Sequence, residues 1–402
     1  MMMSVRIKIK KLLNKLLFVF VLLMILSFPF QYDFLKINVL SNLIEGITTN
    51  IAPYIFEDTS QYTLNFYSDS TGMYLGIVVV FVIALIISLL WFLWSQRKNR
   101  FDEDKKVWFP LLIICICYYL SLQLSMYGFS KVFKYQFYDA HPNTAYTPVG
   151  FLTKDFLYWT SIGSSKLYNT VTGSLEVIIA VLLWFRKTRA LASILGLMIS
   201  LYLVLINFAF DINVKIQGLF FVFLFLIVSY STLQKLFVFF FKGRSVQLRK
   251  SQLKHSQKYR PLSITIKAVL ISLILIESLY PYVSTGNFNG DALEKPPYYG
   301  AYEITGHERY KRFFIHSDPY FIIQDHNDKL YSFPMDFKSN EVVLQYKESI
   351  SILTLQVNDS TLSLDGDFFG YPLDIEGRKL NLSNMPIYED SFQWTIDGYK
   401  KD

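Results

Sequence analysis

Apolar runs of roughly membrane-spanning length alternate with short charged segments over the first 290 positions. An α-helix rises about 1.5 Å per residue, so about 20 residues cross the hydrocarbon core of a bilayer. The pattern predicts an α-helical bundle of about seven transmembrane helices, with one helix in each of Leu12–Phe30, Met73–Trp94, Val107–Met126, Val171–Phe185, Leu191–Phe210, Ile216–Phe240 and Ile264–Val283.

Two of these runs are ambiguous. The first follows the basic segment Lys8–Lys15, as the apolar part of a signal peptide does, but Phe28-Pro29-Phe30 offers no small-x-small cleavage pattern. An uncleaved helix is therefore favoured. The fourth run is short, and it is expected either to extend outward through Tyr168 or to pack inside the bundle away from lipid.

From Tyr299 onward the pattern changes to short stretches with alternating apolar and polar positions, separated by turns rich in Asn, Asp and Gly. Such stretches predict strands of a small all-β domain, either a barrel or a sandwich. The expected strands are Tyr302–Thr305, Arg312–Ile315, Tyr320–Gln324, Glu341–Tyr346, Ser351–Val357, Thr361–Leu364, Tyr371–Ile375 and Lys379–Leu382. We therefore expect a transmembrane domain over residues 1–290, and a β domain over 291–402.

Composition agrees with this division. Hydrophobic residues make up 52% of the 402 residues and charged residues 18%, against about 25% charged in an average globular domain. Residues 1–290 hold 28 basic and 13 acidic side chains, a net charge of +15, whereas residues 291–402 hold 11 and 19, a net charge of −8. The mean hydropathy of +0.30 excludes disordered, collagen-like and coiled-coil classes.

The basic residues predict an orientation. Twenty Lys and Arg fall at the N-terminus and in alternate loops on one side of a seven-helix chain, against six on the other side. By the positive-inside rule, the N-terminus is cytoplasmic and the β domain is periplasmic in a multi-pass protein of the inner membrane. The basic loop Lys242–Arg260 is interpreted as a topology signal that contacts anionic lipid; no nucleic-acid partner is expected.

Polar residues gather at the predicted outer ends of the helices, where burying them is costly and marks a candidate site. Asn207, Asp211 and Lys215 share one face if the helix continues, although a short turn is an equal alternative. The semi-apolar stretch Phe151–Trp159 is too short to span and predicts an interfacial or re-entrant helix. The candidate outer pocket consists of Lys131, Gln136, Tyr168, Glu176, Asn207, Asp211, Lys215 and Asp69. The alternative is that these charges only fix helix packing.

The sequence gives little support for a metal site, a disulfide or a known catalytic motif. The spacing of His307, His316 and His326 matches no metal-ligand motif, so no metal is expected. Cys115 and Cys117 lie two residues apart in a predicted helix and point about 200° apart, so they cannot form a disulfide with each other. The sequence contains no phosphate loop, nucleophile elbow or His-Glu-x-x-His pattern.

An ordered series of short motifs resembles the DoxX-like integral membrane proteins, in the long Bacteroidota form with a C-terminal β domain. The core of the resemblance is expected at about residues 107–240. The motifs are Tyr127-Gly128-Phe129-Ser130-Lys131, Thr147-Pro148-Val149-Gly150, Gly173-Ser174-Leu175-Glu176, Leu182–Arg189 and Asn207–Lys215. The pattern Ser391-Phe392-Gln393-Trp394 echoes the terminal signature of these relatives, with Gln393 where they have His.

Two functions follow as hypotheses. The first is a non-catalytic binding or assembly component of the envelope, whose β domain (residues 291–402) contacts a periplasmic protein partner, a peptide or a lipid. The alternative, which the resemblance favours, is a quinone-interacting redox subunit with menaquinone as its candidate cofactor. In that alternative, Lys131 or Lys215 stabilises developing negative charge and Glu176 or Asp211 carries protons. The sequence does not decide whether the protein is an enzyme.

Overall fold

The computed structural model describes residues 5–27, 34–35, 38–64, 68–97, 101–247, 260–338, 340–358, 361–389 and 394–395. The chain forms two compact units, each built from two separate stretches of sequence. The helical unit comprises Met1–Phe129 and Thr172–Gly286, and the mixed unit comprises Ser130–Val171 and Asn287–Asp402. The predicted division near residue 290 is close to Asn287, but the sequence did not predict that residues 130–171 join the second unit.

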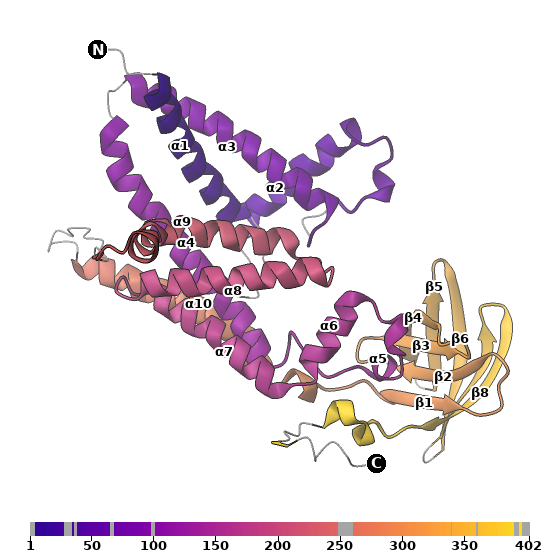
Figure 1. Ribbon diagram of the computed structural model, residues 1–402. Helices are drawn as coiled ribbons and strands as arrows, with labels where there is room; N and C mark the ends of the chain where they lie inside the picture. The colour runs from indigo at the N-terminus through magenta and orange to yellow at the C-terminus, as the bar shows by residue number, and fades with distance from the viewer. Residues whose placement is uncertain are drawn as a thin grey trace. The chain divides into compact units, whose positions relative to one another are not determined.

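A helix forms at each of the seven predicted apolar runs. These are α1 (Val5–Ser27), α3 (Thr71–Arg97), α4 (Phe101–Val132), α7 (Lys166–Leu183), α8 (Arg189–Ala209), α9 (Lys215–Lys242) and α10 (Arg260–Thr285). Helix α7 begins at Lys166 and so includes Tyr168, in agreement with the alternative of a longer helix. Helices α8 and α9 run side by side after a short turn (Figure 1).

Six of these seven helices are long and apolar enough to cross a membrane, as expected for a multi-pass membrane protein. Helix α1 does not reach this standard because Lys8, Lys10, Lys11 and Lys15 occupy its first half. Lys15 is buried, its ammonium donates to Ser95 Oγ at 2.8 Å, and it lies 3.7 Å from the centre of the Trp91 ring. The apolar second half of α1 packs along α3. That α1 spans the bilayer stays a prediction.

An additional helix, α2 (Val39–Ile51), follows α1 and was not predicted. Leu40, Ile44 and Ile47 lie on one face and pack into the core of the helical unit. Their spacing of three and four residues is the usual mark of an amphipathic helix, but at 13 residues the element is too short to register as a membrane span.

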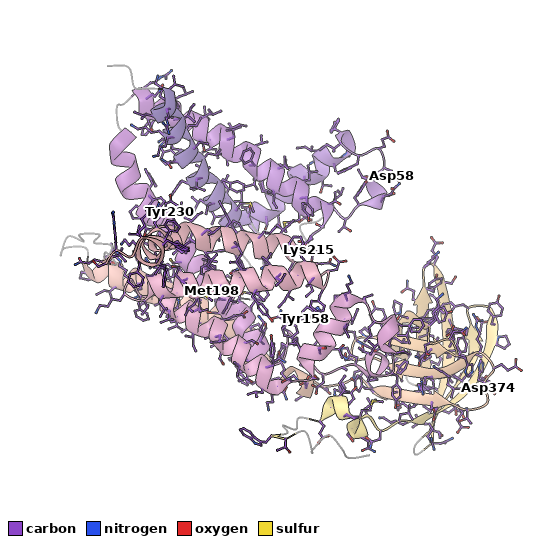
Figure 2. The ribbon with its side chains drawn as sticks, in the orientation of Figure 1. Asp58, Tyr158, Met198, Lys215, Tyr230 and Asp374 are labelled. Atoms are coloured by element: carbon purple, nitrogen blue, oxygen red, sulfur yellow. The ribbon has the colours of Figure 1, made fainter. Side chains whose placement is uncertain are left out.

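In the mixed unit, residues 130–171 form a connector between the ends of α4 and α7. It contains the short helix α5 (Pro142–Ala145), a 3-10 turn over Val149–Phe151, and α6 (Lys154–Gly163). Helix α6 confirms that the stretch around Phe151–Trp159 includes a helix too short to span. Figure 2 labels Tyr158 on this helix.

The rest of the mixed unit is a closed, antiparallel, eight-stranded barrel. Each strand pairs with the next along the chain, and the last pairs with the first, so that no edge is exposed. The strands are β1 (Gly300–Ile304), β2 (Tyr310–Ile315), β3 (Tyr320–Asp325), β4 (Leu330–Lys338), β5 (Glu341–Tyr346), β6 (Ser349–Asn358), β7 (Thr361–Phe368) and β8 (Tyr371–Lys379) (Figure 1). This settles the barrel-or-sandwich alternative.

One strand was not predicted, and one predicted strand does not form. Strand β4 was missed because Pro334 and several polar residues interrupt its apolar pattern, yet it pairs on both sides. The expected strand Lys379–Leu382 does not form, because β8 ends at Lys379 and a 3-10 turn occupies Leu382–Asn384. The Leu380 N–H still donates to the carbonyl of Ala301 at 2.9 Å.

Alternate side chains of each strand fill the barrel interior, as the two-residue period of a strand requires. On β6, Ser351, Leu353 and Leu355 are buried, while Ile350, Ile352 and Thr354 are exposed. The Tyr302 and Phe313 rings stack at 4.8 Å. Gly377 must lack a side chain, because a Cβ there would lie 2.4 Å from the Phe313 ring. The interior is thus a packed core.

Candidate functional site

Asp69 caps a helix far from it in sequence. Its two carboxylate oxygens accept hydrogen bonds from the backbone N–H groups of Lys215 and Ile216, at 2.8 and 3.0 Å. These are the first two residues of α9, so the carboxylate meets N–H groups that have no partner within the helix and the positive end of the helix dipole. A sequence motif before α3 therefore fixes the start of α9 within the helical unit.

Lys215, labelled in Figure 2, lies at the centre of this cluster. Its ammonium is 2.8 Å from Asp211 and 4.0 Å from Asp69. Helix α8 ends at Ala209, so the short-turn alternative is confirmed and a continuous helix is wrong. Asp211 takes a left-handed backbone (φ 54°) in that turn, and the Asn207 amide donates to the Val214 carbonyl at 3.1 Å. The side chains of four predicted residues therefore stabilise the α8–α9 turn: Asp69, Asn207, Asp211 and Lys215.

Removing the cap should destabilise the helical unit. Asp69→Ala is expected to lower the free energy of unfolding by about 1–2 kcal/mol, because two helix N–H groups and Lys215 lose their carboxylate. Asp69→Asn should cost less, since the amide oxygen still accepts one hydrogen bond. Thermal unfolding in detergent measures both. Asp58→Ala is the matched control, since Asp58 caps only a three-residue turn; an equal loss there would contradict the assignment.

The other predicted residues have different surroundings. Glu176 is buried in α7, and Lys131 is buried in the last turn of α4, at 3% and 5% exposure. Ser130 Oγ lies 3.3 Å from the side-chain oxygen of Gln136, and the backbone N–H of Gln136 donates to Ser130 O. Tyr168 is half-buried in the first turn of α7. Asp69, Asp211 and Lys215 thus come together, while Lys131 and Gln136 belong to the mixed unit.

A second charged cluster, centred on Lys134, lies in the mixed unit. The Lys134 ammonium is 2.5 Å from Asp139 and 2.7 Å from Asp291, and the Asp139 backbone N–H donates to Asp291 at 2.7 Å. Burial lowers the pKa of Lys134, but hydrogen bonds and charge from Asp139 and Asp291 outweigh it, so the pKa is raised. This lysine therefore stays charged.

The backbone at this cluster is tightly constrained. Lys134 has a left-handed φ of 54°, an uncommon conformation for a side chain of this size. The Gly290 N–H donates to the Phe133 carbonyl at 2.8 Å, and a Cβ on Gly290 would lie 2.3 Å from the Lys134 carbonyl oxygen. Only glycine permits this approach. The chain that leads into the barrel is therefore fastened to the connector.

Beside this cluster is a cavity of about 410 Å³, which is lined by residues of the connector, including α6. Five aromatic side chains line it, with Phe137 and Trp159 in ring contact at 4.7 Å. Asp139 and Asp155 are its carboxylates, and none of the described lining residues is Lys or Arg. The full lining is Tyr135, Gln136, Phe137, Tyr138, Asp139, Ala140, His141, Thr144, Asp155, Phe156, Trp159 and Thr160. Of the predicted site residues, Gln136 contributes to it.

One residue that lines the cavity, His141, is paired with a second histidine of the barrel. His141 and His316, from the connector and the barrel, have ring centres 4.1 Å apart, and Ser317 Oγ lies 3.5 Å from Nδ1 of each. Burial first, and the neighbouring His316 second, lower the pKa of His141 to about 4. Burial also lowers the pKa of His316. Both rings are therefore neutral near pH 7.

The connector also contacts the outside of the barrel elsewhere. The Arg312 guanidinium lies 4.7 Å from the Tyr146 ring, and the Gln324 amide donates to the Tyr146 carbonyl at 3.3 Å. After β8, the Tyr388 hydroxyl donates to the Ala140 carbonyl at 2.8 Å. The connector is therefore part of the same packed unit as the barrel.

Several of these residues were not predicted as site residues. Lys134, His141 and Trp159 lie in the connector, and only their tertiary partners distinguish them from ordinary loop residues. Glu277 is different, because it is an acid inside an apolar run and the sequence does show that. It is buried in α10 and accepts hydrogen bonds from the backbone N–H groups of Phe34 and Leu35, at 3.2 and 2.8 Å.

The remaining sequence candidates have local roles or lie outside the described residues. His307 Nδ1 accepts from the backbone N–H of Tyr310, and His326 Nε2 lies 3.0 Å from the His307 carbonyl. The described residues contain no group of three or more potential metal ligands. Cys115 and Cys117 are free thiols. Most of the basic loop, residues 248–259, and Gln393 of the terminal signature lie outside the described residues.

Comparison with known proteins finds one similar stretch. The chain is 35% identical over 98 residues to the uncharacterized protein YwoB of Bacillus subtilis (strain 168); the match covers 24% of this chain and 61% of that protein. No protein-family model matches the chain. No solved structure matches it either. The resemblance to DoxX-like proteins therefore stays a prediction.

Proposed function

We propose that this chain is a non-catalytic binding component of the cell envelope that takes an amphipathic ligand bearing an amine or ammonium group. The observation that supports the proposal is the composition of the cavity: five aromatic rings and two carboxylates with no lining cation among the described residues. Aromatic faces and carboxylates both attract positive charge. Its volume of about 410 Å³ suits a small ligand or a headgroup.

The two carboxylates have different roles in this proposal. Asp139 already pairs with Lys134. Asp155 accepts a hydrogen bond from the neutral hydroxyl of Thr153 and keeps its charge available. We therefore assign Asp155 to the ligand's cation, and Trp159 and Phe137 to its apolar part and to cation–π contact. An ammonium-bearing lipid headgroup or a lysine-bearing peptide has this chemistry.

The proposed setting is the periplasmic face of the inner membrane. It follows from the excess of basic residues in the alternate loops, and it would place the mixed unit outside the cytoplasm. The barrel would then contact a periplasmic protein partner, a peptide or a lipid. Exposed Ile350 and Ile352 on β6 are apolar side chains that such a partner could cover. Membership of the DoxX-like family belongs to the same proposal.

Calorimetric titration of the full chain in nanodiscs with hexyltrimethylammonium tests the ligand assignment. Empty nanodiscs provide the blank for partitioning into lipid. We expect saturable binding of this cation and no saturable binding of hexanoate or hexanol, which have the same chain without positive charge. Trp159→Ala should weaken binding about fivefold or more, the equivalent of about 1 kcal/mol of cation–π and packing energy.

The matched control is Trp394→Ala, because Trp394 is 89% exposed and does not line the cavity. Asp155→Asn should weaken binding of hexyltrimethylammonium, because the carboxylate assigned to its positive charge is lost. Equal binding of hexanoate and the cation would contradict the proposal, and so would an equal loss in the Trp159 and Trp394 variants.

The quinone-interacting alternative stays a prediction, and the structure offers it no specific support. Lys215, one of its two candidate cations, already pairs with Asp211 and lies at a helix cap. Adding a menaquinone analogue to the same titration tests this alternative. Saturable binding that Glu176→Ala weakens would favour the redox function over the one proposed here.

A further inference from the structure

A second cavity, of about 640 Å³, lies within the helical unit where the chain turns from α7 into α8. Four basic side chains line it and none of the described lining residues is acidic. Its lining residues come from α4, the α7–α8 turn and the first turns of α10. The lining residues that carry the argument are Arg186, Lys187, Arg189, Lys267, Trp184 and Ser263.

Hydrogen bonds hold the turn and its Arg189 side chain in place. The Arg189 guanidinium donates to the Leu183 carbonyl from both Nε and Nη2, at 3.4 Å each, and so caps the C-terminal end of α7. The Thr188 hydroxyl donates to the Leu182 carbonyl at 2.6 Å. The Trp184 indole N–H donates to Ser121 Oγ of α4 at 2.5 Å. Hydrogen bonds to α4 and α7 therefore fix the conformation of the basic turn.

Lys267 is the lining cation that α10 contributes. It lies two turns inside α10, within a helix apolar enough to span a membrane. Its ammonium is 4.2 Å from the centre of the Phe185 ring, and the charges acting on it are the cations Arg186 and Arg189. Like charges gathered at the edge of an apolar region repel each other and are costly to desolvate. A bound anion would relieve both costs.

We propose that this cavity binds the phosphate headgroup of an anionic phospholipid. Basic pockets between membrane helices on the cytoplasmic side characteristically hold such headgroups. Lys267 and Lys187 would bind the phosphate, and Ser263 would donate a hydrogen bond to it. The apolar lining of Ile114, Ile266 and Leu270 provides a surface for the first part of an acyl chain.

A lipid fits this place better than a soluble anion because the surrounding helix face is apolar. Leu262, Ile264 and Val269 of α10 are each more than half exposed, as expected for side chains that meet lipid. A soluble phosphate would gain only the charged half of the site. The inference does not depend on the amine-binding cavity, which is in the other unit, so the two proposals fail independently.

Native mass spectrometry of the full chain in detergent, titrated with phosphatidylglycerol and with phosphatidylcholine, tests the proposal. We expect phosphatidylglycerol to bind at least about tenfold more tightly, as expected for charge-assisted hydrogen bonds to one phosphate. Lys267→Met should remove most of this preference, and Lys267→Arg should keep it. The matched control is Lys235→Met in α9, which does not line the cavity and should bind as the unmodified chain does.

Further outcomes also decide the question. Lys187→Gln changes an exposed side chain and should reduce the preference for phosphatidylglycerol without affecting folding. This variant keeps the test valid if Lys267→Met fails to fold.

Glycerol phosphate titrated alone separates a soluble anion from a lipid. If it binds as tightly as phosphatidylglycerol, the lipid assignment is overturned. Equal binding of the two phospholipids, or equal effects of Lys267→Met and Lys235→Met, would overturn the site itself.

Discussion

Replacing Lys134 by methionine should lower the free energy of unfolding of the mixed unit by about 3 kcal/mol. The change keeps the length of the side chain and leaves Asp139 and Asp291 facing each other without a cation. Removing one partner of a buried ion pair typically costs about 3–5 kcal/mol. We expect the lower end of that range because the Asp139 side chain is 41% exposed. Urea-induced unfolding followed by near-ultraviolet circular dichroism measures the loss.

Two comparisons make the Lys134 result specific. Lys338→Met removes an exposed lysine from β4 and should change stability by less than about 0.5 kcal/mol. The triple variant Lys134→Met, Asp139→Asn, Asp291→Asn removes all three charges together and should recover part of the loss, because no unpaired carboxylate is left. If Lys134→Met were no more harmful than Lys338→Met, the cluster would not stabilise the connector.

The stability of the mixed unit should fall as the pH drops from about 6.5 to about 4. The pKa of His141 is lowered from 6.5 in the unfolded chain to about 4 in the folded one. Between these pH values the unfolded state binds more protons than the folded state. The free energy of unfolding therefore decreases as the pH decreases. The stabilisation is complete above pH 6.5, and the loss attributable to His141 approaches about 3 kcal/mol at low pH. Carboxylates also titrate in this range, so the comparison with variants carries the test.

His141→Gln should flatten the dependence of unfolding free energy on pH between 6.5 and 4.5. The matched control is His326→Gln, which changes an exposed histidine of the same unit and should leave the slope unchanged. The slope is the decisive measurement, since His141→Gln also removes the ring contact with His316 and lowers stability at every pH. An unchanged slope in His141→Gln would contradict the role of the buried neutral ring.

The candidate site shows where reading the sequence succeeded and where it failed. The sequence singled out Asp69, Asp211 and Lys215 because charges beside apolar runs need partners, and the structure brings these three together. It could not show that Asp69 caps α9, because the two lie 146 positions apart. It did not place Lys134 and His141 in the candidate pocket, since a lysine and a histidine in a polar connector are ordinary until their burial is known. Glu277 could have been found, because it interrupts an apolar run.

The elements themselves were largely readable from the sequence. Apolar runs of spanning length identified seven helices, and alternation identified seven of the eight strands. Strand β4 was lost because Pro334 and its polar neighbours mask the two-residue period. Helix α2 was not predicted. Its apolar residues have helical spacing, but the segment was too short to be recognised as a membrane span.

Local patterns in the sequence were enough to locate most of the helices and strands and the apolar segments long enough to meet lipid. They also showed that the net charge of +7 combines a basic helical part with an acidic tail. Those properties depend on neighbours along the chain, so periodicity and composition reveal them. The tertiary structure decided that the strands close into a barrel, that residues 130–171 join it, and that two cavities form, one lined by aromatic rings with carboxylates and one by cations. These depend on contacts between residues far apart in sequence, such as Lys134 with Asp291 and Phe185 with Lys267, and a single sequence carries no local record of such contacts.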